Sequence, residues 1–281
     1  MKSYWTDAVV LRSRPLGEAD RLVSLLSDSE GKIRATARGA RRGRSSLVAG
    51  TQPFVYARYQ LFRGRELDSI TQVQLVRSHL AVRDQLLSFA LASYVAEVVD
   101  WTTMERQPVP GVFRLLLTLL AELDEHPPRS PGRALALESW FELHHLGELG
   151  YRPQLDGCVL CHRPLLPSAG RSTDNSGWWL QPAQGGLVCS SCRSQSPSAE
   201  PGVLLGDEVI LCLRRWQQEA EPDPGAVADP SQPAGRQLAA ALRMYVDYYV
   251  NHTIRSLPFL AELMGTTAAA GDGGGPRASR A

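Results

Sequence analysis

Apolar and polar residues alternate through the first third of the chain at the two-residue period of a β-strand. Within Ile33–Arg38 this alternation places Arg34 and Arg38 on the solvated face of a strand. The pattern predicts short strands at Ala8–Arg12, Arg21–Ser27, Ile33–Ala40, Phe54–Phe62 and Leu67–Val76. Strands of this number and length are typical of a small closed barrel, either an OB-fold or an SH3-like barrel.

The hydrophobic period changes after residue 80, where Leu87, Leu91 and Val98 recur at helical spacing. Further helices are predicted at Gly111–Glu125, Arg133–Leu149, Asp207–Ala220 and Ala234–His252. Three prolines between the first two of these segments forbid a continuous helix. Residues 221–233 are rich in Pro and Asp and are expected to form a loop.

These patterns predict an α+β protein with more than one domain, in keeping with its 281 residues. The predicted order is an N-terminal β-barrel, OB-fold or SH3-like, at 1–80 and a helical domain at 81–265. A cysteine-bearing insert at about 152–200 interrupts the helical domain. Residues 266–281 offer almost nothing to bury, so we expect a disordered tail there.

Charge is distributed unevenly along a chain whose net charge is only +1. Residues 1–80 hold 14 Lys and Arg against seven Asp and Glu, whereas the remainder is acidic. Between Gly31 and Arg65 there are nine Lys or Arg and no acidic residue. A solubilising surface normally mixes both signs, so this unmixed run favours a polyanionic ligand such as nucleic acid.

The candidate nucleic-acid contacts lie on the third predicted strand, the loop after it and the next strand. They are Lys32, Arg34, Arg38, Arg41, Arg42, Arg44, Tyr56 and Arg58. Phosphate contacts of this kind bind independently of sequence and weaken steeply with salt. The period of two puts Phe54, Tyr56 and Arg58 on one face of their strand, which is expected to face solvent. There Tyr56 could stack on a base or pack against the neighbouring domain.

Two C-x-x-C pairs, Cys158 with Cys161 and Cys189 with Cys192, are separated by 27 residues. Four thiolates in this pattern predict a closed tetrahedral zinc site with a structural role, because no position remains open for water. The alternatives are a c-type haem motif at Cys158–His162, a redox pair, or two unrelated reduced pairs. The fifth cysteine, Cys212, is expected to be a small core residue.

No stretch of the sequence approaches the 18 or so apolar residues of a membrane span, and no export signal is recognisable, so we expect a cytoplasmic protein with no membrane partner. The sequence also contains no phosphate-cradling P-loop and no deaminase motif. Its six histidines share no face. These observations favour a binding protein over an enzyme.

Several short segments, in this order, resemble the bacterial recombination mediators of the RecO family. They are Ala8-Val9-Val10-Leu11, Gly17-Glu18-Ala19-Asp20, Gly31-Lys32, Ala37-Arg38-Gly39-Ala40-Arg41-Arg42, Gln52-Pro53-Phe54 and Leu146-Gly147-Glu148-Leu149-Gly150-Tyr151. The first cysteine pair follows the last of them, and the similarity covers about residues 5–264.

This resemblance implies an N-terminal OB-fold, a helical domain with a zinc knuckle, and a DNA repair function in the bacterial cytoplasm, associated with the nucleoid. It implies that the protein binds single- and double-stranded DNA and anneals complementary strands. It also implies two protein partners, RecR and the C-terminal tail of single-stranded DNA-binding protein, with which the protein helps to load recombinase. By position, Lys32, Arg34, Arg38, Arg41 and Arg42 match the family's basic strand and loop. Two other classes remain open from the residues alone, a zinc-ribbon protein acting on RNA or in transcription and a zinc-dependent hydrolase.

Overall fold

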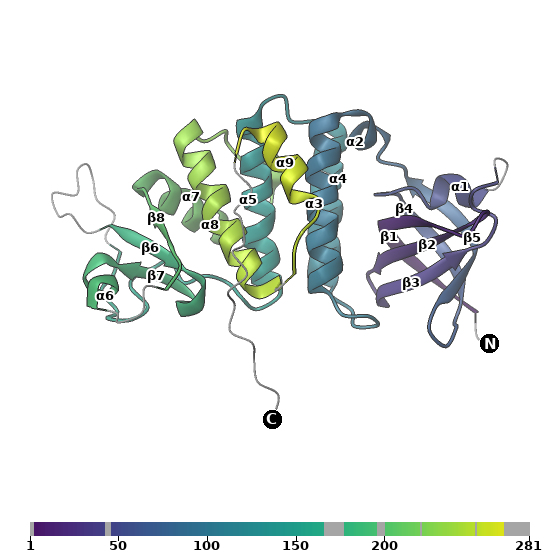
Figure 1. Cartoon of the computed structure of the whole chain (residues 1–281), viewed down its shortest axis with the longest axis horizontal. Helices are drawn as coiled ribbons and strands as arrows, with labels where there is room; N and C mark the ends of the chain where they lie inside the picture. The colour runs from purple at the N-terminus through teal and green to yellow at the C-terminus, as the bar shows by residue number, and fades with distance from the viewer. Residues whose placement is uncertain are drawn as a thin grey trace.

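The computed structural model describes residues 3–42, 46–165, 177–195, 200–219, 221–250 and 252–266. The elements form three groups in a row (Figure 1). A β-barrel lies at one end, a bundle of helices in the middle, and a small sheet at the other end. Within the described residues, no helix is both long enough and apolar enough to cross a membrane.

The N-terminal strands form a closed barrel in the order β1-β2-β3-β5-β4. The strands are β1 (Ser3–Leu16), β2 (Asp20–Ser27), β3 (Gly31–Ala37), β4 (Tyr56–Phe62) and β5 (Asp68–Arg77). A short parallel pairing of β3 with β5 closes the barrel, and the other pairs are antiparallel. The register of β1 shifts between Val10 and Arg12, which lets one long strand curve and pair with both β2 and β4.

The predicted alternation on β3 is confirmed. Ile33, Ala35 and Ala37 are fully buried inside the barrel, whereas Arg34 and Arg38 are exposed. The short helix α1 (Ser46–Gly50) between β3 and β4 was not predicted. It lies against the barrel, since the hydroxyl of the buried Tyr59 donates a 2.8 Å hydrogen bond to the carbonyl oxygen of Gly50.

The middle group is helical, as predicted, and is centred on the almost entirely buried α5 (Pro131–Glu148). Its other helices are α2 (Leu80–Asp84), α3 (Leu86–Thr102), α4 (Pro110–Glu125), α7 (Asp207–Gln217), α8 (Gln232–Val250) and α9 (Leu257–Met264). Helices α4 and α5 begin with Pro110 and Pro131, at the first helical position, where the backbone N–H has no partner within the helix. The Ser130 side chain caps α5 by accepting a hydrogen bond from the Arg133 N–H. Helices α2 and α9 were not predicted.

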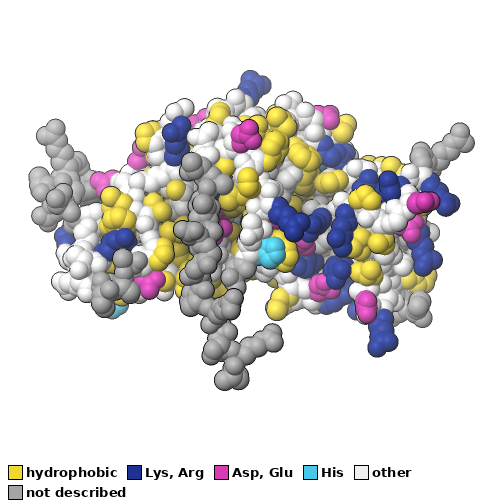
Figure 2. Space-filling model, viewed as in Figure 1, with side chains coloured by type: hydrophobic (Ala, Val, Ile, Leu, Met, Phe, Trp, Pro, Cys, Tyr) yellow, Lys and Arg dark blue, Asp and Glu magenta, His cyan; other side chains and the backbone are white. Residues whose placement is uncertain are grey.

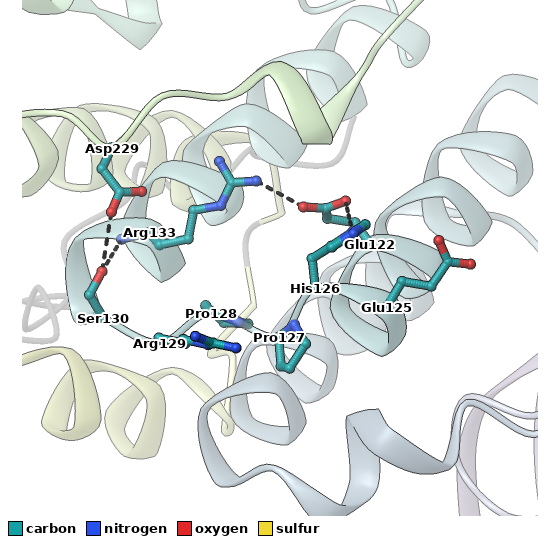
Figure 3. A pocket seen from close by; sticks show the side chains of 9 residues that line it. All are labelled: Glu122, Glu125, His126, Pro127, Pro128, Arg129, Ser130, Arg133 and Asp229. Atoms are coloured by element: carbon teal, nitrogen blue, oxygen red, sulfur yellow. Dashed lines mark hydrogen bonds and ion pairs between the residues drawn. The ribbon is translucent and has the colours of Figure 1, made fainter.

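The Pro/Asp-rich loop is tied to the N-terminal end of α5 (Figure 3). It contains the one-turn 3-10 helix η2 (Pro224–Ala226). The Arg133 guanidinium donates to the carbonyl oxygens of Pro224 and Val227 and to Glu122 of α4, while Ser130 donates to Asp229. The loop therefore packs as part of the bundle.

The cysteine-bearing insert forms a small sheet in the order β7-β6-β8. Its elements are β6 (Trp178–Gln181), the 3-10 helix η1 (Pro182–Gln184), β7 (Gly186–Cys189), α6 (Ser190–Gln195) and β8 (Val203–Leu205). Strand β8 lies beyond the end predicted for the insert and pairs with β6.

The structure has two large hydrophobic cores, and one of them crosses the boundary between barrel and bundle. One fills the barrel, and the other runs from the helices to the outer face of the barrel, where it includes Val9, Leu26 and Phe54. The prediction that Phe54 faces solvent was wrong. Its side chain is only 2% exposed and packs edge-on against Phe89 of α3, with ring centroids 5.8 Å apart, because the bundle covers this side of the barrel.

Candidate nucleic-acid interface and metal site

Three exposed arginines, Arg38, Arg41 and Arg42, lie at the end of β3 and in the turn after it. Gly39 adopts φ +68° in this turn, a value that favours glycine, and its N–H donates to the Asp20 carboxylate at 2.8 Å. The backbone and guanidinium of Arg41 both donate to carbonyl oxygens of the β1–β2 turn. The arginines therefore lie on a fixed rim of the barrel.

Lys32 and Arg34 lie nearer the bundle and are paired with its carboxylates. The Lys32 side chain is only 14% exposed, with its Nζ 3.7 Å from the Asp100 carboxylate, and it also donates to the Asp100 carbonyl oxygen. Arg34 remains half exposed, 3.6 Å from Glu105. The alternation gave the correct outward face for both residues, but Lys32 is not solvated there because the end of α3 covers it.

Tyr56 and Arg58 do not lie beside Arg38. Their strand, β4, is separated from β3 by β5 on one side and by β1 and β2 on the other. Tyr56 packs edge-on against Phe113 of α4, at 6.1 Å between centroids, and burial raises its pKa. Arg58 is exposed, with its guanidinium 5.8 Å from the centre of the Trp5 ring. Arg44 lies outside the described residues.

Two exposed arginines on β1, Arg12 and Arg14, were missed in the sequence although their two-residue spacing could have identified them. With Arg34 they line a cavity of about 320 Å³ between the barrel and the end of α3. Figure 2 shows Lys and Arg side chains gathered on the barrel and where it meets the helices. The cationic surface thus extends from the rim toward the bundle.

Arg106, in the loop after α3, holds the barrel against the bundle. Its guanidinium lies 2.6 Å from the carboxylate of the fully buried Asp68 and donates to the Tyr4 hydroxyl at 3.0 Å. Burial alone would raise the pKa of Asp68, but hydrogen bonds from Arg106 and Tyr4 outweigh it and lower that pKa. The ion pair fixes the position of the cationic surface relative to the helices.

The four predicted cysteine ligands converge. The Sγ atoms of Cys158, Cys161, Cys189 and Cys192 all lie within 4.8 Å of one another. Those of Cys161 and Cys189 are 3.8 Å apart. A tetrahedral zinc with Zn–S bonds of about 2.3 Å requires sulfur atoms about 3.8 Å apart, so the cluster fits that ion. Cys212 is a separate, half-buried residue packed against the bundle core, and burial raises its pKa to about 11.

The backbone around the first cysteine pair is arranged to stabilise thiolates. A side chain at Gly157 would meet the Arg163 carbonyl oxygen at 2.5 Å, so only glycine allows the hairpin in which the Cys158 N–H donates to that oxygen. Burial raises the pKa of the Cys158 thiol, but backbone N–H groups of Cys161, Cys189 and Leu160 outweigh it and lower the pKa to about 6. Trp179 is covered by the Arg193 guanidinium at 3.6 Å, and Trp178 packs in the core of the insert.

Family models of known proteins match both the N-terminal and the C-terminal part of the chain. Residues 1–79 match the family described as Recombination protein O N terminal, and residues 83–258 match Recombination protein O C terminal. The chain belongs to the RecO family. RecO proteins are DNA repair proteins, so the general role of this chain is in DNA repair and recombination.

Similar RecO proteins occur across distant bacteria. A relative from Desulforudis audaxviator is 33% identical, over 94% of this chain and 98% of its own length. One from Cutibacterium acnes is 35% identical over 92% and 99%. One from Symbiobacterium thermophilum is 40% identical over 71% and 75%. Each is named DNA repair protein RecO.

Proposed function

We propose that this protein is a non-enzymatic recombination mediator that binds single- and double-stranded DNA on its barrel and anneals complementary strands. The observation that carries the proposal is the rim of Arg38, Arg41 and Arg42, which is exposed, held by backbone hydrogen bonds and free of salt bridges within the described residues. Cations arranged in this way bind phosphates irrespective of base sequence. Neutralising the phosphates lowers the repulsion between two strands, and base pairing then drives annealing.

The barrel is an OB-fold in this proposal. Five strands in the order β1-β2-β3-β5-β4, with the parallel β3–β5 pair and a helix between β3 and β4, support that assignment over an SH3-like barrel. The face and loops of OB-folds commonly bind single strands.

Zn²⁺ bound by Cys158, Cys161, Cys189 and Cys192 is the metal of this proposal, and its role is structural. The four sulfur atoms match the dimensions of a tetrahedral site and leave no ligand position for water. The chain would contribute the thiolates and the backbone donors that stabilise them.

The proposed partners are those that the resemblance to the RecO family implies. We infer that the helical domain docks RecR and the C-terminal tail of single-stranded DNA-binding protein, and that recombinase is loaded indirectly on the coated strand. The protein would work in the bacterial cytoplasm, associated with the nucleoid.

We expect the affinity for a labelled oligothymidylate to fall steeply with salt. Six phosphate contacts on a single strand give a log–log slope of about −4. Fluorescence anisotropy from 50 to 300 mM NaCl measures the slope, and annealing of complementary labelled oligonucleotides, with and without single-stranded DNA-binding protein, tests the activity. A flat salt dependence, or equal annealing rates with and without the protein, would reject the proposal.

Stronger competition by an equal-length RNA would favour an RNA-binding function, since a DNA mediator does not need the 2′-hydroxyl.

Replacing Cys189 with Ser should abolish stoichiometric zinc binding, because three thiolates no longer close the site. Elemental analysis should give about one zinc per wild-type chain and less than about a tenth of that in Cys189→Ser. Hydrogen exchange should increase in residues 178–195 and not in β1–β3. The matched control is Cys212→Ser, which removes a cysteine outside the cluster and should keep the metal. Unchanged zinc content in Cys189→Ser would contradict the assignment.

A further inference from the structure

One side chain, Trp101 near the end of α3, lies between two cavities of different character. On the barrel side it borders the basic cavity with Arg12, Arg14 and Arg34. On the bundle side it borders an apolar cavity of about 320 Å³, together with Val98, Leu146, Tyr151 and Tyr249. Trp101 is 43% exposed. We call Arg12, Arg14, Arg34, Trp101 and the apolar cavity the junction site.

The aromatic groups of the junction site are already arranged for stacking. The His252 ring lies on the Trp101 ring with centroids 3.4 Å apart and an angle of 19° between planes. Tyr151 and Tyr249 are stacked at 4.1 Å. Tyr151 is 44% exposed, so part of this aromatic surface is open to solvent. A flat ring can therefore extend a stack that exists without it.

Charges beside Trp101 favour a polyanion over a single carboxylate. Asp100 and Glu105 partly neutralise Lys32 and Arg34, and Glu97 interacts electrostatically with Arg12 while accepting hydrogen bonds from Ser256. Within the described residues Arg14 has no ion pair. The guanidinium groups of Arg12 and Arg14 on β1 and of Arg34 on β3 are spread over two strands rather than converging on one point, which suits a chain of phosphates.

The junction site is continuous with the arginine rim. Arg34 lies on the outer face of β3 and Arg38 directly follows the last residue of that strand, and four residues of extended chain span about 13 Å. A nucleic-acid strand held at the rim therefore reaches Trp101 without leaving the barrel surface. A peptide with one acidic end would need only one of these regions.

We propose that the junction site captures a nucleotide of single-stranded DNA, with the base stacked on the Trp101–His252 pair at the apolar cavity and the flanking phosphates on Arg12 and Arg14. This inference rests on the proposed DNA-binding function and extends it from the barrel to the helical domain. It assigns to the helices a direct contact with the bases, in addition to docking protein partners.

The test uses the full-length protein and an oligothymidylate containing 2-aminopurine, whose fluorescence is quenched when the base stacks. Trp101→Ala should weaken binding about tenfold and remove most of the quenching that depends on protein, whereas Trp101→Phe should keep most of both. Arg12→Ala/Arg14→Ala should make the log–log salt slope shallower by about 1.4. The matched controls are Phe259→Ala, an exposed aromatic on α9, and Arg129→Ala/Arg236→Ala, and all should bind as wild type. Arg129 lies in the loop before α5 and Arg236 near the start of α8, whereas residues near the ends of these two helices line the apolar cavity.

The outcomes separate the two levels of the proposal. If wild type and Trp101→Ala bind and quench alike while loss of the rim arginines weakens binding, the junction site is overturned and the DNA-binding function stands. If Trp101→Ala keeps its DNA affinity but loses binding of an acidic peptide with an apolar C-terminal end, the site belongs to a peptide and the inference is wrong. If the wild type binds no DNA, both proposals fail.

Discussion

Replacing Arg38, Arg41 and Arg42 together with alanine is expected to weaken binding of single-stranded DNA roughly 100-fold at 0.1 M salt. Each phosphate contact contributes about −0.7 to the log–log salt slope, so three lost contacts make the slope shallower by about 2. The counterion contribution to binding vanishes near 1 M salt. A slope change of about 2 therefore corresponds to a loss of about two orders of magnitude in affinity at 0.1 M salt. Annealing should decrease with binding, because it depends on the same neutralised phosphates.

The fold should not change in this variant. All three side chains are exposed, and alanine at these positions retains the hydrogen bonds from the Gly39 N–H and the Arg41 backbone. Only the exposed hydrogen bond from the Arg41 guanidinium to the Gly17 carbonyl oxygen is lost. Thermal unfolding monitored by circular dichroism checks this point, and anisotropy titrations measure the affinity.

A control variant with the same net charge separates local contact from general attraction. Arg129, Arg215 and Arg236 are exposed arginines of the helical domain, outside the rim and the junction site. Their triple alanine variant should change affinity by less than about threefold, because charges farther away than about 10 Å are screened at 0.1 M salt. Equal losses in both triple variants would show that only the total charge matters, and the rim would not be the interface.

The barrel was largely predictable because its strands have an inside and an outside. Alternation identified β2 and β3 within two or three residues of their ends, and it placed Ile33 inside and Arg34 outside. The cysteine cluster was predictable for a different reason, since the residue type and the local spacing together specify the ligand geometry. Both signals depend on a few neighbouring residues.

The contacts between the barrel and the bundle could not be predicted in this way. Alternation says that Phe54 and Lys32 point away from the barrel interior, but not that α3 covers them. The strands of the insert were missed because three or four residues are too short to show a period. Helix α9 begins after the end of the last predicted helix and is only eight residues long. So short a segment shows no clear period in the sequence, and its position depends on its packing against α3.

Replacing Arg243 with Met is expected to lower the free energy of unfolding by about 3–5 kcal/mol. Arg243 on α8 makes a two-bonded ion pair with Glu138 on α5, at 2.6 and 2.8 Å, and both side chains are almost completely buried. The variant leaves the Glu138 carboxylate without its partner in the centre of the helical domain, which costs far more than the lost pair itself. Urea unfolding monitored by circular dichroism measures the change.

Two companion variants test that explanation. Arg236→Met changes an exposed arginine on the same helix and should alter stability by less than about 0.5 kcal/mol. Glu138→Met/Arg243→Met removes both buried charges and should recover most of the loss. If Arg243→Met is as stable as Arg236→Met, the ion pair does not support the bundle.

Glu142, one turn beyond Glu138, should give the opposite result when it is replaced by Gln. Burial raises the pKa of Glu142 well above its usual value, and the nearby Glu138 charge raises it further. These effects outweigh the Tyr94 hydroxyl, which donates to the carboxylate and lowers its pKa, so we expect a neutral carboxyl group in the folded protein. A carboxyl whose pKa is higher in the folded state stabilises the protein fully below its ordinary pKa of 4.5, and that stability is lost as the pH rises toward the raised value. Glu142→Gln mimics the neutral form at every pH. At pH 5 its free energy of unfolding should differ from that of wild type by less than about 1 kcal/mol. Between pH 5 and 8 its free energy of unfolding should decline less than that of wild type. Parallel pH dependences in the two proteins would mean that Glu142 is ionised in the folded state.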